Sequence, residues 1–202
     1  RRSSDLIARL ERVDAVLHLG DYIYEYGAAP GDYGMSIGAR IGRAPQPPHE
    51  ILSLADYRTR HALYKSDPDL QAAHARAPWI VVWDDHETAN DSWTAGAENH
   101  QPDTEGDWSK RKANALKAYF EWLPIREPAA GKPFEAINRV FSFGDVAKLI
   151  MTETRLTARD HQLTFAHDLM VQGPDGHPVP DLNGFNAKLN DQARQLMGPA
   201  QE

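Results

Sequence analysis

The chain contains no cysteine, which excludes disulfide bridges and any thiolate-based metal site within its 202 residues. No apolar run approaches the roughly 18 residues that a membrane-spanning helix needs, so we expect no transmembrane segment. Basic residues are also few: 22 Lys and Arg stand against 29 Asp and Glu, for a formal net charge of -7. Because phosphate backbones are bound by clustered positive charge, we expect no nucleic-acid-binding surface.

What remains is an ordinary globular composition, with 41% hydrophobic and 25% charged residues. This length and composition predict one domain with a sizeable core. The acidic excess would be partly offset by a bound polyvalent cation.

One stretch, Trp79 to Asp91, joins an apolar run to a cluster of polar side chains. Residues 79–83 are β-branched or aromatic and predict a short strand buried on both faces. The polar residues Asp84, Asp85, His86 and Glu87 follow at once. Since ligands bind beyond the carboxyl ends of strands in open α/β sheets, we expect the functional site here.

A second predicted strand ends in the same way. Residues 15–19 are mostly apolar and lead into Gly20 and Asp21. The two strands therefore bring acidic residues to one edge of a sheet. The next segment is rich in tyrosine; we expect Tyr22 and Tyr26 to pack in the core and Glu25 to face solvent.

Further elements follow from periodicity and from turn residues. The segment 27–49 is longer than most structureless loops, so we expect an ordered excursion or a cover for the site. Apolar spacings of three and four predict helices, alternation predicts a hairpin at 139–152, and a break is expected at Asp67-Pro68. The expected helices span residues 4–12, 51–77 (in two parts), 108–122 and 186–197.

The polar side chains at the strand ends form a plausible ligand set. Carboxylate, phenol, imidazole and amide donors suit hard or borderline cations such as Ca, Mn or ferric Fe, and a pair of such ions can activate water for attack on phosphorus. The candidates are Asp21, Tyr24, Asp84, Asp85, His86 and Asn90.

Each of these residues also has a simpler explanation. Asp21 after a glycine suits a turn, and the acids at 84–87 suit the first turn of a helix. Arg155 could form an ion pair with Glu153 as readily as it could contact phosphate. The joint occurrence of these residues in one order favours the catalytic interpretation.

Three stretches carry a family resemblance: Leu17-His-Leu-Gly-Asp-Tyr-Ile-Tyr-Glu-Tyr26, Val82-Trp-Asp-Asp-His-Glu-Thr-Ala-Asn90 and Met151-Thr-Glu-Thr-Arg155. In sequence and in order they resemble signatures of the PhoD-like alkaline phosphatases, a branch of the calcineurin-like metallophosphoesterases. The resemblance covers about residues 1–162.

The resemblance implies an α/β fold of the metallophosphoesterase α/β/β/α sandwich type and a periplasmic or secreted location. It implies hydrolysis of phosphomonoesters or phosphodiesters by a metal-activated water, with Fe and Ca as cofactors and Mn or Zn as possible replacements. Asp21, Tyr24, Asp84 and Asp85 would be metal ligands, His86 and Asp85 catalytic residues, and Asn90 and Arg155 substrate contacts.

Two motifs of this family lack a counterpart. Its first motif lies upstream of the opening helix, and a later Gly-Asp-x-His type segment has only a loose echo in Asp175-Gly176-His177. We therefore expect residues 1–202 to be a partial catalytic domain, about half of a whole one, with its motifs within 14–162 and no assignment for 163–202.

Two other functions remain open. Paired carboxylates such as Asp85 and Glu87 could serve a glycoside hydrolase. A calcium-stabilised domain that binds without catalysis would also use this donor set.

Overall fold

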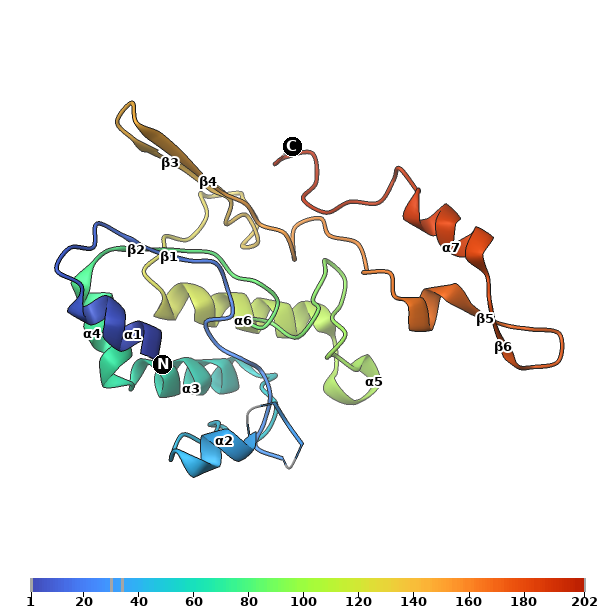
Figure 1. Ribbon diagram of the computed structural model, residues 1–202, viewed down its shortest axis with the longest axis horizontal. Coiled ribbons are helices and arrows are strands. Elements are labelled where there is room, and N and C mark those ends of the chain that lie inside the picture. Colours follow the sequence, from blue (N-terminus) through green and yellow to red (C-terminus); the bar gives the residue numbers. More distant parts are fainter. Residues whose placement is uncertain (1, 30, 34, 202) are drawn as a thin grey trace.

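The computed structural model describes residues 2–29, 31–33 and 35–201. Helices and short strands alternate in its first half, and hairpins dominate the second (Figure 1). The elements are α1 (Arg2–Arg9), β1 (Val16–His18), α2 (Met35–Arg40), α3 (Leu54–Lys65), α4 (Pro68–Arg76), β2 (Trp79–Val81), α5 (Pro102–Glu105), α6 (Trp108–Trp122), β3 (Arg139–Phe143), β4 (Ala147–Met151), the π-helix η1 (Phe165–Leu169), β5 (Met170–Gln172), β6 (Pro178–Pro180) and α7 (Leu182–Leu189).

The two strands expected to carry the site pair in parallel, with Val16 opposite Trp79 and His18 opposite Val81. The prediction that β2 is buried is confirmed at Trp79 and Val81. The prediction of a buried β1 is wrong, because Leu17 is 50% exposed. Side chains alternate across a strand, so Leu17 lies on the face opposite Val16 and His18, and that face is open to solvent.

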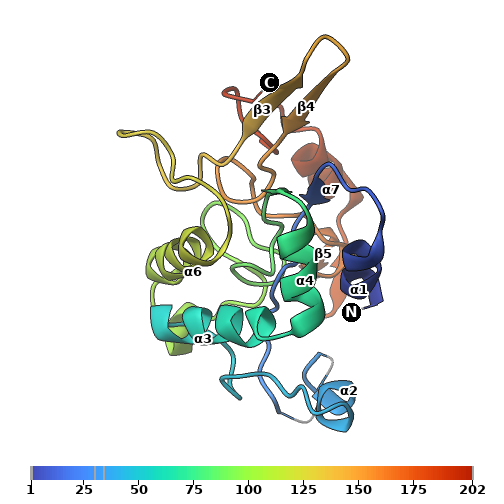
Figure 2. The ribbon, with the colours of Figure 1, turned by 90° about the vertical axis from the view of Figure 1, so that its left-hand side faces the viewer.

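The helices α3 and α6 lie side by side beneath the two strands, and α1 packs against α4 (Figures 1 and 2). Trp83, just beyond β2, is buried and meets Tyr119 of α6 edge-on at 5.3 Å between ring centroids. Ser53 begins α3 with a reciprocal capping box to Asp56. These contacts place the end of β2 against the helical layer.

Most helix predictions are confirmed, with shifted ends. The break between α3 and α4 occurs at Asp67, whose side chain accepts hydrogen bonds from the N–H groups of Asp69 and Leu70. The described residues of the segment 27–49, which are all but 30 and 34, include the helix α2. The helix predicted at 186–197 is wrong, since α7 begins after its N-cap Asp181 and ends at Leu189.

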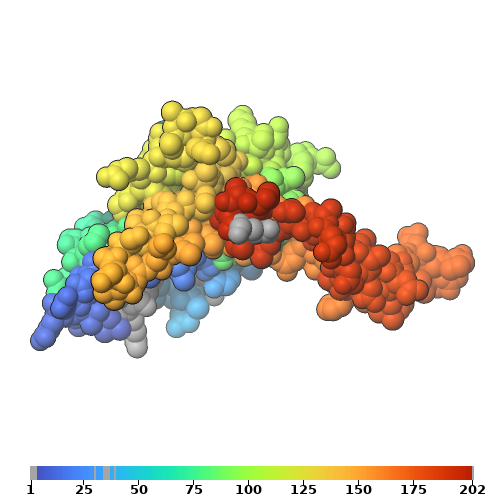
Figure 3. Space-filling model, turned by 90° about the horizontal axis from the view of Figure 1, so that it is seen from above, coloured from blue at the N-terminus to red at the C-terminus, as the bar shows by residue number. Residues whose placement is uncertain are grey.

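The C-terminal part forms an arm that extends away from the helical body (Figures 1 and 3). It consists of η1, the antiparallel pair β5–β6, and α7, and every residue of β5 and β6 is exposed. The β3–β4 hairpin, predicted from alternation, is confirmed.

The α/β class is confirmed, and the described residues contain part of the implied sandwich. Their sheets are all two-stranded. No helix in the described ranges is both long and apolar enough to cross a membrane.

His61 of α3 gives a prediction about stability. Its side chain is fully buried, and neither ring nitrogen has a hydrogen-bond partner. Burial, with a smaller contribution from Lys65, lowers the pKa of His61 to about 3. In the unfolded chain, His61 has its ordinary pKa of about 6.5 and binds a proton below that pH, whereas in the folded chain it stays neutral. His61 therefore lowers the free energy of unfolding as the pH falls below about 6.5.

The free energy of unfolding of the parent protein should fall between pH 7.5 and pH 5. In His61→Phe, we expect this decrease to be smaller by about 2 kcal/mol. Urea unfolding at the two pH values measures this. The exposed His177→Gln is the control and should leave the difference unchanged; an equal difference in His61→Phe and the parent would contradict the prediction.

Candidate metal centre

The backbones beyond β1 and β2 lie in direct contact. Gly20 has φ of +114°, and a Cβ placed on it would lie 2.3 Å from the backbone nitrogen of Asp84. Asp21 follows with φ of +57°, a left-handed conformation that is uncommon outside glycine. Glycine is therefore required at position 20 for the two loops to approach this closely.

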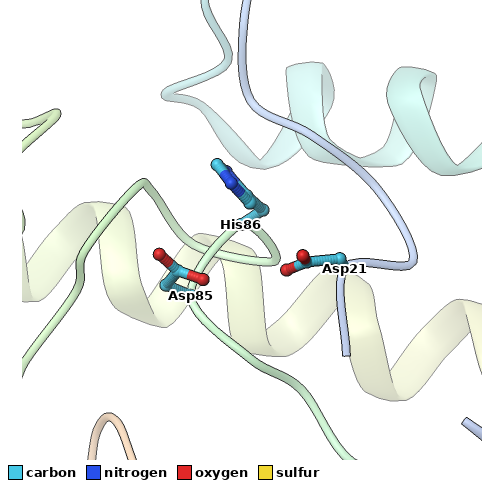
Figure 4. A group of neighbouring side chains, drawn as sticks. All are labelled: Asp21, Asp85 and His86. Atoms are coloured by element: carbon cyan, nitrogen blue, oxygen red, sulfur yellow. The ribbon is translucent and has the colours of Figure 1, made fainter. Parts of the chain in front are cut away.

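This contact brings Asp21, Asp85 and His86 together (Figure 4). One potential ligand atom from each lies within 4.8 Å of the others. Asp85 is 5% exposed, and its Oδ2 accepts a hydrogen bond from the N–H of Asp91 at 2.6 Å. The Oδ1 atom of Asp21 is buried without a hydrogen-bond partner, as expected of an oxygen that binds a cation.

Tyr24 lies beside this triad. Its hydroxyl donates to Asp21 Oδ2 at 3.2 Å, and its ring lies 4.3 Å from the His86 ring. Burial raises the pKa of Tyr24, and the negative charge of Asp21 makes the second-largest contribution in the same direction. A cation on this oxygen would have to displace the phenolic proton, and the role of Tyr24 as a ligand stays a prediction.

Arg155 links the third motif to the same edge. Its Nε donates to Asp84 Oδ1 at 2.5 Å, and its other nitrogens lie 3.5 Å from Asp85 Oδ1 and 3.6 Å from Asp91 Oδ1. Asp84 therefore faces Arg155 and is not part of the triad.

Glu153 does not pair with Arg155, so that simpler interpretation is wrong. Its Oε1 accepts hydrogen bonds from Trp83 Nε1 and from the backbone N–H groups of Arg155 and Leu156, and its Oε2 accepts one from that of Thr157. These bonds shape the turn that presents Arg155.

The side chain of Asn90 donates from Nδ2 to Glu98 Oε2 at 3.0 Å, and its backbone N–H donates to Glu25. Asn90 thus lies in the loop after β2, and its side-chain amide is hydrogen-bonded to Glu98. Its contact with substrate stays a prediction.

The structural roles of two buried glutamates near the triad, Glu25 and Glu87, were not identified from the sequence. Glu25 is fully buried, so the prediction that it faces solvent is wrong. It shares a face with Ile23, which is also fully buried, and this alternation was a signal that could have found it. Its Oε2 lies 2.8 Å from His86 Nδ1.

Glu87 ties the two strand-end loops together. One carboxylate oxygen accepts from the N–H of Tyr22 and the other from the N–H of Asp84. Burial raises the pKa of Glu87 to about 7. Because the carboxylate is fully buried and both oxygens are engaged, it cannot pair with Asp85 as a glycosidase would require. The acids at 84–87 also do not begin a helix, because the chain forms an isolated turn at residues 86–88.

The loose echo at 175–177 lies in the β5–β6 turn, where Asp175 Oδ1 accepts from the N–H of His177. Figure 1 shows this hairpin at the opposite end of the molecule from β1 and β2. It contributes nothing to the triad.

The geometry defines a class of site: a carboxylate and imidazole centre at the carboxyl ends of parallel strands, chemically suited to a hard or borderline cation. Comparison with known proteins identifies the family of the whole chain. A family model described as PhoD-like phosphatase matches residues 4–202, and the chain belongs to that family. The match continues past residue 162, where the resemblance from sequence motifs ended.

Alkaline phosphatase D of Bacillus subtilis (strain 168) is 40% identical over 194 residues, which is 95% of this chain and 29% of that protein. A solved structure titled "Structure of PhoD" aligns with a TM-score of 0.72 at 35% identity, covering 98% of this chain and 34% of that one. The chain thus spans about a third of the length of these relatives.

The contact at Gly20 predicts an unequal pair of glycine substitutions. Gly20→Ala adds a collision with Asp84 to an unfavourable φ, and we expect it to cost about 3 kcal/mol of unfolding free energy. Gly144→Ala in the β3–β4 turn is the matched control, because φ there is +58° but nothing lies within 4 Å of the added Cβ. It should cost about 1 kcal/mol. Denaturant unfolding compares the two; equal losses would show that the collision is relieved elsewhere.

Proposed function

We propose that this chain carries part of the active site of a metal-dependent phosphoesterase that hydrolyses phosphomonoesters or phosphodiesters. The observation that carries the proposal is the unpartnered, buried Oδ1 of Asp21 within reach of Asp85 and His86. Membership of the PhoD-like phosphatase family supports the reaction class, and a small-molecule or polymer phosphoester is the proposed substrate. By the same resemblance we propose a periplasmic or secreted location.

The proposed cofactors are Fe and Ca, with Mn or Zn as alternatives. Asp21 and Asp85 would hold them together with Tyr24 and Asp84, and Asp84 would exchange its bond to Arg155 for the cation. Bound there, such ions would activate a water and neutralise charge on the phosphoryl group.

His86 is proposed to stabilise the phosphoryl oxygens or the leaving group. Burial acts to lower the pKa of His86, but the hydrogen bond and charge of Glu25, with the charges of Asp85 and Asp21, raise it above its ordinary value. The contact with Glu25 thus stabilises positive charge on the ring, and a ring nitrogen that carries a proton can donate to a phosphoryl oxygen.

Arg155 is proposed as the phosphate contact. Its Nη1 lies 3.6 Å from Asp91 Oδ1, beyond hydrogen-bond distance, so a phosphate oxygen that reached this nitrogen would replace only a long ion pair. The planar guanidinium matches phosphate geometry. Asn90 is proposed as a weaker contact from the same edge.

Replacement of Asp85 tests the site assignment. In the full-length enzyme, where the parent chain supplies the missing ligands, Asp85→Ala should lower kcat/KM for 4-nitrophenyl phosphate and for its bis ester by about 100-fold or more while the fold is retained. The matched control is Asp145→Ala, a change at an exposed turn residue, which should leave the rate unchanged. An unaffected rate in Asp85→Ala would remove the assignment.

Metal content tests the chemistry. Elemental analysis of the purified protein, prepared without added metals, should give iron and calcium at near-stoichiometric levels, and a chelator should abolish turnover. Metal-dependent melting without phosphoester turnover would instead indicate a calcium-stabilised binding domain. Full activity in metal-free protein would contradict the proposal.

A further inference from the structure

Glu25 is held in the loop after β1 by three hydrogen bonds, all to one later segment of the chain. Its Oε2 pairs with His86 Nδ1 at 2.8 Å. Its Oε1 accepts from the N–H of Asn90 at 2.7 Å and from Asn99 Nδ2 at 2.9 Å. A fully buried carboxylate requires such partners, because its desolvation is otherwise costly.

The hydrogen bond with Glu25 determines which nitrogen of the His86 ring carries a proton. An ionised carboxylate only accepts hydrogen bonds, so Nδ1 must carry the proton that is shared with Glu25. The Nε2 atom is then the nitrogen left to act on a substrate or a cation. A carboxylate behind an imidazole fixes its orientation and increases its basicity in the same way at many metal sites.

The neighbours of Glu25 hold the same ring. Tyr24 lies 4.3 Å and Tyr26 lies 5.6 Å from the His86 ring centroid, so three consecutive residues contact one imidazole. Glu25 bonds to the edge of the ring at Nδ1, and the Tyr24 ring lies against the imidazole at an interplanar angle of 32°. The ring is thus held against both rotation and displacement.

Two other glutamates, Glu87 and Glu153, are buried to the same degree but differ in what they hold. Glu87 accepts from backbone N–H groups, and Glu153 accepts from Trp83 and from backbone N–H groups. Among these three glutamates, Glu25 is the one bonded to a side chain of the triad.

We propose that Glu25 is a positioning residue for the phosphoester reaction: it holds His86 in the Nδ1–H form with Nε2 free to act. This inference rests on the proposed function for its effect on turnover. The geometry between Glu25 and His86 is independent of that function and can be tested separately.

The test compares Glu25→Gln with Glu153→Gln in purified protein loaded with calcium alone, a diamagnetic ion. In the parent protein we expect a downfield proton resonance from His86 Nδ1–H, assigned by its loss in His86→Gln. It should disappear or shift upfield in E25Q and persist in E153Q. A resonance that is unchanged in E25Q would overturn the proposal whether or not the protein is a phosphoesterase.

Turnover supplies the second readout. In the metal-loaded enzyme we expect E25Q to lower kcat by about 10- to 100-fold with little change in KM. Glu25→Asp retains the charge and should recover part of that loss; it also serves if E25Q does not fold. The proposal would be overturned if E25Q lost as much stability as E153Q while the kcat of its folded fraction stayed unchanged. That result would show that Glu25 has a purely structural role. No turnover in the full-length protein without substitutions, with the resonance behaving as expected, would refute the phosphoesterase function alone.

Discussion

The site depends on the close backbone contact between the loops that follow β1 and β2. Gly20 lies against Asp84 with no room for a Cβ between them. The parallel register of the two strands sets this approach, and Glu87 secures it by accepting an N–H from each loop. Asp21 and Asp85 each lie next to one of these tied residues. Their separation is therefore set by backbone geometry more than by their own side chains.

Hydrogen bonds to buried carboxylates do much of the ordering that a wider sheet would otherwise do. The two strands are only three residues long, and the loops after them run on without regular structure. Glu25, Glu87 and Glu153 are fully or nearly fully buried, and each accepts at least two hydrogen bonds from the loops around the triad. A buried acceptor left without its donors is costly, so these bonds hold the loops in one arrangement.

Local patterns in the sequence were sufficient to predict both strands, the helices α3, α4 and α6, and the meeting of acidic residues at one edge. Each rests on a signal within a short window, such as apolar spacing or a strand run followed by polar residues. The partners of Glu25, Glu87 and Arg155 were out of reach of such signals, because they are separated along the chain by 61, 65 and 71 residues. The exposed face of β1 was missed for a related reason: burial depends on what packs there, which strand composition does not reveal.

Under the proposed function, the charge balance at this edge favours binding of a cation before a phosphate. Asp21, Asp84, Asp85 and Asp91 gather there. Among the described residues, Arg155 forms ion pairs with three of them, and a nitrogen of the His86 imidazole lies within 4.8 Å of Asp21 and Asp85. A phosphate ester is itself an anion, and like charges in a partly buried site repel strongly. Arg155 already shares its guanidinium among three of the aspartates, and the contact of its Nη1 with Asp91 Oδ1, at 3.6 Å, is the longest of the three. A bound cation at Asp21 and Asp85 would neutralise these carboxylates and so reduce their repulsion of the phosphate. Arg155 would then be less engaged in ion pairs with the aspartates and could contact the phosphate. We therefore expect metal binding and phosphate binding to reinforce each other at this edge.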